Sequence, residues 1–139
     1  MPYPESMCAP MRQDLTSTGF EELKTPQDVN VAFSANSKGS MLVFVNSVCG
    51  CAAGAARPAV KLSLENSKKP ERLFTVFAGQ DLDATAEARK YMLPYPPSSP
   101  SIALFKDGKL VHLVERHRIE GYTANMIAEH LKAAYDQFC

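Results

Sequence analysis

The chain lacks tryptophan, carries no excess of charge of either sign and contains no long apolar run. A membrane-spanning helix needs about 18 consecutive apolar residues, and no stretch of this sequence approaches that length. Fifteen Lys and Arg residues balance fifteen Asp and Glu residues across 139 positions, so charge gives no reason to expect binding to nucleic acid or to an anionic membrane surface. We therefore expect a globular protein whose partners include no nucleic acid and no membrane.

Cysteine is scarce as well, with four residues whose spacing does not suggest a disulfide framework: Cys8, Cys49, Cys51 and Cys139. The opening stretch MPYPESMCAP lacks a basic region followed by an apolar core, so we expect no signal peptide and a cytoplasmic location. In a reducing cytoplasm, a small set of cysteines is typical of redox catalysis or of metal binding.

Metal binding is an alternative interpretation of these cysteines. Cys49 and Cys51, together with Cys8 or Cys139 and a histidine, would supply ligands suited to zinc. The Cys-x-x-Cys spacing of structural zinc sites is absent, however. We therefore expect no metal site, and a zinc or soft-metal module is kept as an alternative.

The apolar segments alternate between strand-like and helix-like patterns, which predicts an α/β sandwich with a central mixed sheet flanked by helices. We expect one domain over residues 1–139, with residues 1–19 as an N-terminal helical extension. Helices are expected at residues 11–19, 25–39, 51–66, 82–93 and 123–138. Strands are expected at residues 20–24, 40–47 and 72–79, and a hairpin at 102–116.

Local signals support these boundaries. Thr25 followed by Pro26 is a strong helix start, and Asp81 is placed to cap the helix expected at residues 82–93. Pro58 lies inside an expected helix, where a kink is predicted. Asp107-Gly108 is a typical two-residue hairpin turn.

The sequence VNSVCGCAAGAARPA places Cys49 where a buried strand passes into a helix. Ligands of open α/β sheets bind beyond the carboxyl ends of the strands, so this turn lies at an edge where chemistry is expected. The unpaired N–H groups and dipole of a helix start stabilise a thiolate, so the pKa of Cys49 should fall below its reference of about 8.5. Cys49 is thus the candidate nucleophile of thiol–disulfide exchange.

Cys51 lies only two residues further on. Two residues at i and i+2 of a regular helix point about 200° apart, so their sulfurs are expected to point away from each other unless the backbone distorts. Gly50 is expected to supply part of the required backbone freedom. We expect the pair to handle mixed disulfides better than it donates electrons from a stable dithiol.

The linked motifs VNSVCGCAAGAARPA, VFAGQD, PPSSPS and ERHRIEG closely resemble the bacilliredoxin family over nearly the whole chain. The resemblance implies a thioredoxin-like fold and a thiol–disulfide oxidoreductase that removes bacillithiol, a low-molecular-weight thiol, from mixed disulfides on proteins. It implies no cofactor, with bacillithiol as co-substrate. The implied partners are S-bacillithiolated client proteins, bacillithiol itself and, indirectly, a bacillithiol disulfide reductase. A protein disulfide isomerase is the alternative within the enzyme class.

Site residues follow from the same resemblance. Cys49 would take up the bacillithiol group, and Cys51 would resolve that adduct or protect the site. Ser99-Pro100 fits the cis-proline that thioredoxin-like folds place opposite the active cysteine. The candidate substrate-binding residues are Gly50, Ser99, Pro100, Arg116 and His117. His112 is expected to be exposed, Cys8 to have no catalytic role, and Cys139 to be a mobile terminal residue.

Overall fold

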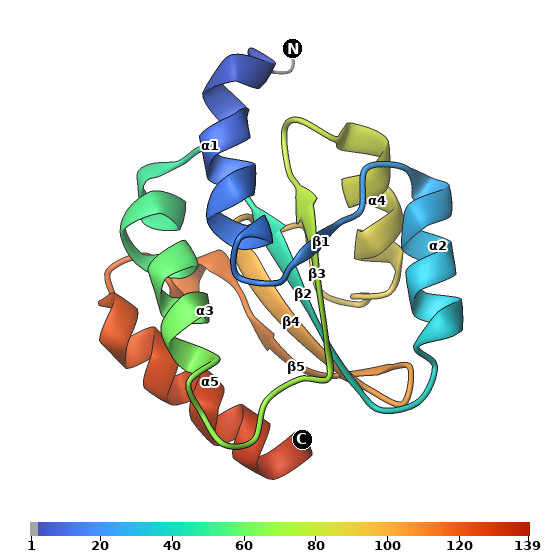
Figure 1. Ribbon diagram of the computed structural model, residues 1–139, viewed down its shortest axis with the longest axis vertical. Helices are drawn as coiled ribbons and strands as arrows, with labels where there is room; N and C mark the ends of the chain where they lie inside the picture. Colours follow the sequence, from blue (N-terminus) through green and yellow to red (C-terminus); the bar gives the residue numbers. More distant parts are fainter. Residues whose placement is uncertain (1–2) are drawn as a thin grey trace.

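The computed structural model describes residues 3–139, which are built around a mixed five-stranded sheet of order β1-β3-β2-β4-β5 (Figure 1). The strands are β1 (Glu21–Glu22), β2 (Ser40–Asn46), β3 (Arg72–Phe77), β4 (Ser101–Lys106) and β5 (Lys109–Val114). The first three run parallel, whereas β4 is antiparallel to β2 and β5 to β4. The predicted α/β class with a mixed sheet is confirmed.

Helices cover both faces of the sheet (Figure 1). On one side α3 (Arg57–Ser63) packs on α5 (Ala124–Phe138), and on the other α2 (Pro26–Ala35) packs on α4 (Leu82–Lys90). Every residue of β2 is buried, since Leu42 and Phe44 face one helical layer while Val43 faces the other. Burial on both faces explains the continuous apolar run in this strand.

The N-terminal helix α1 (Glu5–Thr16) begins six residues before the predicted start. It contains Pro10, which lies before the predicted start. Its buried residues Cys8, Arg12 and Leu15 recur at helical spacing, so one face of the helix is held against the rest of the protein. Packing therefore extends the helix through the proline.

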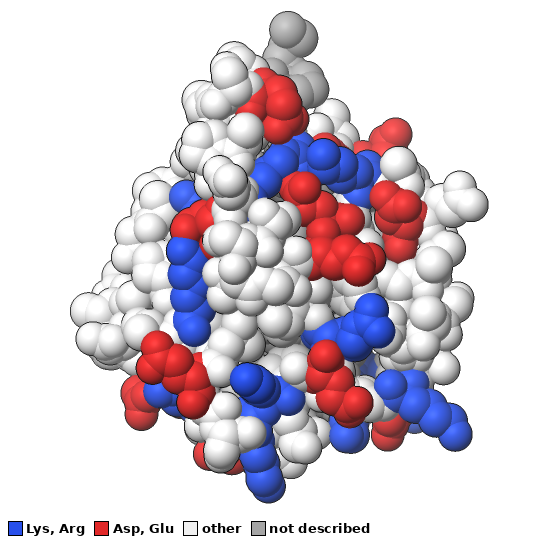
Figure 2. Space-filling view, viewed as in Figure 1, with Lys and Arg blue, Asp and Glu red and all other residues white. Residues whose placement is uncertain are grey.

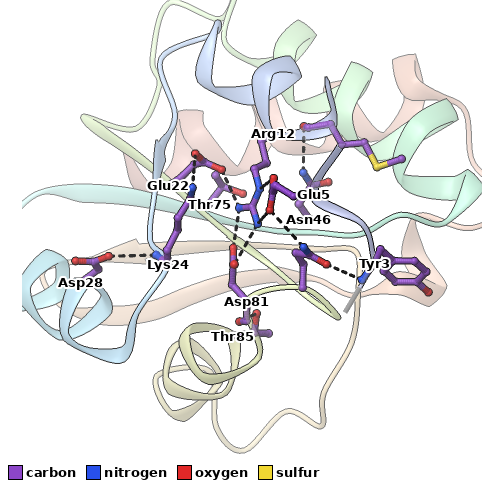
Figure 3. Close-up of polar contacts among 12 residues, drawn as sticks. Tyr3, Glu5, Arg12, Glu22, Lys24, Asp28, Asn46, Thr75, Asp81 and Thr85 are labelled. Atoms are coloured by element: carbon purple, nitrogen blue, oxygen red, sulfur yellow. Dashed lines mark hydrogen bonds and ion pairs between the residues drawn. The ribbon is translucent and has the colours of Figure 1, made fainter. Parts of the chain in front are cut away.

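Arg12 joins α1 to two other elements (Figure 3). Its guanidinium donates to Asp81 at 2.7 Å, to Glu5 at 2.9 Å and to Glu22 at 3.0 Å. Because the Asp81 carboxylate binds Arg12, it makes no cap hydrogen bond to α4, and the predicted side-chain cap is wrong. Elsewhere on the face shown in Figure 2, basic and acidic side chains are interspersed.

Two segments replace the single kinked helix predicted over residues 51–66. A π-helical turn, η1 (Ala52–Ala56), precedes α3, and the Arg57 N–H bonds to the Ala52 carbonyl across it. Pro58 then lies in the first turn of α3, where a missing N–H costs little. The π-helical turn and the proline are therefore adjacent in the chain. Single π-helical turns inside helices are often found at functional sites.

Other local predictions are confirmed. The Thr25 hydroxyl accepts from the Asp28 N–H at 3.0 Å, and Pro26 is the first residue of α2. Asp107 and Gly108, with φ of 52° and 81°, form the tight turn between β4 and β5. A short 3₁₀ segment, η2 (Arg116–Arg118), follows β5. Within residues 3–139, every helix is too short or too polar to cross a bilayer.

Candidate active site

The two neighbouring cysteines lie at the end of β2, where the chain turns into η1. Cys49 directly precedes the helical residues, and its carbonyl accepts the first hydrogen bonds, from the N–H groups of Ala52 at 3.1 Å and Ala53 at 3.3 Å. The Sγ atoms of Cys49 and Cys51 are 2.8 Å apart. The expectation that the sulfurs point away from each other is therefore wrong, because Cys49 lies outside the helix and is not subject to its 100° step.

Hydrogen bonds around Cys49 favour its thiolate. Partial burial acts to raise the pKa of Cys49, but hydrogen bonds from the thiol of Cys51, from Ser47 and from backbone N–H groups outweigh it. The net pKa of Cys49 is lowered, in the direction that the sequence predicts. Ser47 also accepts from the Cys49 N–H at 3.2 Å, which fixes the turn.

Cys51 has the opposite electrostatics. Burial raises the pKa of Cys51, and its interaction with Cys49 raises it further. Arg116 acts against this shift, and Glu120 adds to it. The pair thus favours the thiolate on Cys49 and the proton on Cys51, which is the order of acidity that nucleophilic attack by Cys49 requires.

Arg57 is a buried cation whose hydrogen bonds hold the chain just before the two cysteines. Arg57 is only 4% exposed, and its guanidinium donates to the Asn46 side-chain oxygen at 2.8 Å and to the Ser47 carbonyl at 2.9 Å. Asp14 of α1 lies 3.4 Å from its Nε and also contacts Lys61. The sequence shows Arg57 only as a nearby positive charge. An arginine in an otherwise alanine-rich segment was the available signal.

The segment before β4 lies against the residues that follow β5. The Ser99–Pro100 bond is cis, as predicted, and Pro100 is buried. Arg116 donates from its side chain to the Ser99 carbonyl at 3.2 Å and from its backbone to the Ser98 hydroxyl at 2.7 Å. A second cis bond, Leu93–Pro94, was not predicted. Arg116 therefore bonds to the cis-proline segment and also interacts electrostatically with both thiols.

The remaining candidate residues border the same region. His117 is exposed and lines a pocket of about 540 Å³ together with Ser99 and Arg116. Gly50 is exposed, has no positive φ, and a Cβ added there would meet nothing within 4 Å. The expectation that Gly50 supplies backbone freedom is therefore wrong. Arg89, which also lines the pocket, was missed because its sequence context is an ordinary helix end.

The two other cysteines have different surroundings. Cys8 is fully buried in α1, close to the charges of Glu5, Arg12 and Asp81. Cys139 packs beside Ser40 at the start of β2, about 20 Å of strand away from the end that carries Cys49. Its N–H bonds to Tyr135, so it is not the free end that the sequence suggested. Among the described residues, no cluster of three or more His, Cys, Asp or Glu could hold a metal.

Solved thioredoxins share this fold. The structure of a Fasciola hepatica thioredoxin aligns with a TM-score of 0.56 and 20% identity, covering 86% of this chain and 100% of that one. A reduced Schistosoma mansoni thioredoxin pre-protein aligns with a TM-score of 0.55 and 21% identity, covering 85% and 96%. These likenesses establish a thioredoxin-like fold.

Sequence relatives are much closer. A family model described as disulphide isomerase matches residues 3–139. A bacilliredoxin of Cytophaga hutchinsonii is 61% identical over 97% of this chain and 98% of its own, and one of Halalkalibacterium halodurans is 49% identical over 99% and 94%. The chain belongs to the bacilliredoxin family. As a bacilliredoxin-family member with a thioredoxin-like fold, it is a thiol–disulfide oxidoreductase.

Proposed function

We propose that this protein removes bacillithiol, or a similar low-molecular-weight thiol, from mixed disulfides on client proteins, with Cys49 as nucleophile. The observation that carries the proposal is the paired cysteine geometry: two sulfurs 2.8 Å apart, with the pKa of Cys49 lowered and that of Cys51 raised. The bacilliredoxin relatives support the choice of co-substrate. We place the reaction in a reducing cytoplasm, where thiolates persist.

The first step is a thiolate–disulfide exchange. The Cys49 thiolate attacks the bacillithiol sulfur of the mixed disulfide and forms a new S–S bond. The old S–S bond breaks, and the client sulfur leaves as a thiolate, which then takes up a proton. Client protein is reduced and Cys49 carries bacillithiol, so no external oxidant or reductant is consumed.

A second exchange clears the adduct. A free bacillithiol thiolate attacks the adduct, releasing bacillithiol disulfide and restoring the Cys49 thiolate. Alternatively Cys51 loses its proton, attacks Cys49 Sγ and expels bacillithiol as a thiolate, leaving an internal disulfide. Bacillithiol disulfide would then be the substrate of a separate reductase.

In this scheme, Arg116 and the Ser99–Pro100 segment position the incoming disulfide. The backbone before Pro100 offers polar groups to an extended client segment, and Arg116 adds positive charge beside the thiols. Gly50, between the two cysteines, is exposed and leaves open space at that position, and His117 borders the pocket that Ser99 and Arg116 line.

The direct experiment uses the Cys51→Ala variant with an S-bacillithiolated client protein. We expect a bacillithiol adduct on Cys49, seen by mass spectrometry, together with release of reduced client. The Cys49→Ala variant is the control and should form no adduct. A Cys51→Ala protein that leaves the client modified would contradict the proposal.

The description of the matching family model favours one other candidate, a protein disulfide isomerase. Such an enzyme would rearrange disulfides in a scrambled test protein with no small thiol present. Recovery of native activity in that assay, abolished by Cys49→Ala, would support isomerisation.

A further inference from the structure

The pocket that Ser99 and Arg116 line also contains two charged residues, Arg89 and Glu115, that have no role in the proposed function. Its volume is about 540 Å³, and its lining includes Arg89, Ser98, Ser99, Glu115 and Arg116. Arg89 comes from the end of α4, the two serines from the cis-proline segment, and the last two residues from the chain after β5. Three segments that are distant in sequence therefore meet around one space.

Neither Cys49 nor Cys51 lines this pocket, but two of its lining residues interact electrostatically with the thiols. Arg116 and Glu120 both line it, and both act electrostatically on Cys51. The charge of Cys49 also acts to raise the pKa of Arg116. We therefore expect a group attached through a short linker to a sulfur on Cys49 to reach the pocket.

Some of the charged residues in the pocket have a partner of opposite charge and others do not. Arg116 is paired with Glu120 at 3.2 Å, so each of these two charges has a partner of opposite sign. Arg89 forms no salt bridge or side-chain hydrogen bond with any of residues 3–139, and its Nε is buried without a partner. The Glu115 carboxylate likewise has no cationic partner in the part of the chain that the structure describes, and no salt bridge joins it to Arg89.

A half-buried guanidinium without an acceptor is costly, because burial removes water and nothing replaces it. Burial alone lowers the pKa of Arg89, with no acidic group acting in the other direction. The negative end of the α4 dipole offsets part of this cost but leaves Nε without an acceptor. An anionic group on a ligand would supply the acceptor that Nε lacks, and a carboxylate fits the planar guanidinium best.

We propose that this pocket holds the small-thiol half of the mixed disulfide, and that the thiol is of the amino-acid class, with Arg89 receiving its carboxylate and Glu115 its ammonium group. The inference rests on the proposed function, and it adds the chemical class that the site selects. One free charge of each sign on the pocket wall matches a zwitterion better than a simple anion.

The test uses symmetric disulfides that differ only in charge: dithiodipropionate with carboxylates, cystamine with ammonium groups, and hydroxyethyl disulfide with neither. In each reaction the Cys49 thiolate bonds to one sulfur of the probe, the S–S bond breaks, and the other half leaves as a thiolate. In a Cys51→Ala background the adduct persists, so its rate of formation is read by mass spectrometry. Taking the ratio to the neutral probe cancels any change in the nucleophile itself.

We expect Arg89→Met to lower the dithiodipropionate-to-neutral rate ratio about tenfold, the loss typical of one hydrogen bond to a charged group. Glu115→Gln should lower the cystamine-to-neutral ratio about threefold, since a charge that is still partly in contact with solvent contributes less than a buried one. Arg118→Met is the matched control: it removes an arginine near, but not in, this pocket and should leave both ratios unchanged. Arg89→Lys keeps the positive charge and should retain most of the carboxylate preference.

Two results would overturn the subsite. One is a dithiodipropionate-to-neutral rate ratio that does not change in Arg89→Met. If this variant instead slows only the reaction with a protein mixed disulfide, Arg89 contacts the client protein and not the small thiol. The other is an equal loss in Arg89→Lys and Arg89→Met, which would show that charge is not recognised. Failure of every probe to form an adduct on Cys49 would instead contradict the proposed function, so the two failures are distinguishable.

Discussion

The pKa values of Cys49 and Cys51 are shifted in opposite directions because of their immediate contacts. Cys49 precedes the helix and accepts hydrogen bonds, whereas Cys51 is in the first helical residues and donates a hydrogen bond from its thiol to Cys49. The S–H of Cys51 is thus part of what stabilises the thiolate. Single-residue spacing allows this arrangement because Cys49 lies outside the helical geometry.

Replacing Cys51 should therefore raise the pKa of Cys49. Cys51→Ala removes the donor, and Cys51→Ser keeps a hydroxyl in its place, so the apparent pKa should rise more in the alanine variant. The pH dependence of alkylation at Cys49 measures both. An apparent pKa that is unchanged in Cys51→Ala would show that Cys51 does not stabilise the thiolate.

Gly50 offers a second prediction at this scale. Because its backbone is not in a glycine-only conformation and a Cβ would meet nothing, Gly50→Ala should leave the free energy of unfolding unchanged or raise it by up to about 1 kcal/mol. The added methyl would project into open space at a position between the two cysteines, so adduct formation with a bulky client should slow. Destabilisation by more than about 1 kcal/mol in urea unfolding would contradict this.

At the scale of elements, β5 and α5 are joined by a pair of histidines. His112 Nε2 lies 2.8 Å from His130 Nε2, so His112 is half-buried and not exposed as predicted. One ring must donate and the other accept, which requires at least one neutral imidazole. Protonating both rings would place two donors, and two positive charges, in contact.

Stability should depend on pH through this pair. Burial lowers the pKa of both histidines, and the charge of His130 lowers that of His112 further. A lowered folded-state pKa means that the unfolded chain takes up protons first as the pH falls. Stability is then fully present above the unfolded value of about 6.5 and is lost as pH falls through it.

Urea unfolding at pH 7.5 and pH 5.5 checks this prediction. The free energy of unfolding should fall between the two pH values in the natural protein. The fall should be smaller in His130→Gln, which cannot charge. An equal fall in both proteins would assign the pH dependence to other groups.

The elements also show how far the sequence could be read. Thr25-Pro26 predicted a helix start and Asp107-Gly108 a turn because each signal acts within a few residues. The apolar run of β2 predicted a central strand, and its end located the cysteine turn. Asp81 looked like a cap but binds Arg12, which is 69 positions away and left no mark in the local pattern.

The site was predictable to a similar extent. Cys49, Cys51 and the cis bond at Pro100 followed from the motifs and from the position of the turn. The 2.8 Å sulfur contact did not, because it depends on which residue starts the helix. Arg57 and Arg89 were unremarkable in sequence, since burial and the lack of a partner are visible only in three dimensions.

At the scale of the whole molecule, Arg12 ties α1 to β1 and to the start of α4 (Figure 3). Its side chain is 9% exposed, and those of Asp81 and Glu22 are 15% and 24% exposed. The carboxylates of β1 and of the loop before α4 would repel each other without the cation between them. The network therefore holds the N-terminal helix in place at the edge of the sheet.

Removing the cation should be costly. Arg12→Met leaves the Asp81 carboxylate without its cation and leaves Glu22 only the more distant Lys24, at 3.9 Å, and we expect it to lower the free energy of unfolding by about 3 kcal/mol. Arg12→Met combined with Asp81→Asn should recover part of that loss, since one of the stranded charges is gone. Glu5→Gln is the control and should change stability little, because Glu5 is 59% exposed. A loss below about 0.5 kcal/mol in Arg12→Met would contradict this role.

The central claim is that Cys49 is the activated thiolate of this fold. The most direct test is the pH dependence of alkylation at each cysteine, mapped by mass spectrometry on reduced, chelator-treated protein. We predict that Cys49 reacts fastest, with an apparent pKa below the reference of about 8.5, and that Cys139 reacts as an ordinary or slower thiol. If Cys49 reacts no faster than Cys139, the thiolate assignment and the mechanism built on it are wrong.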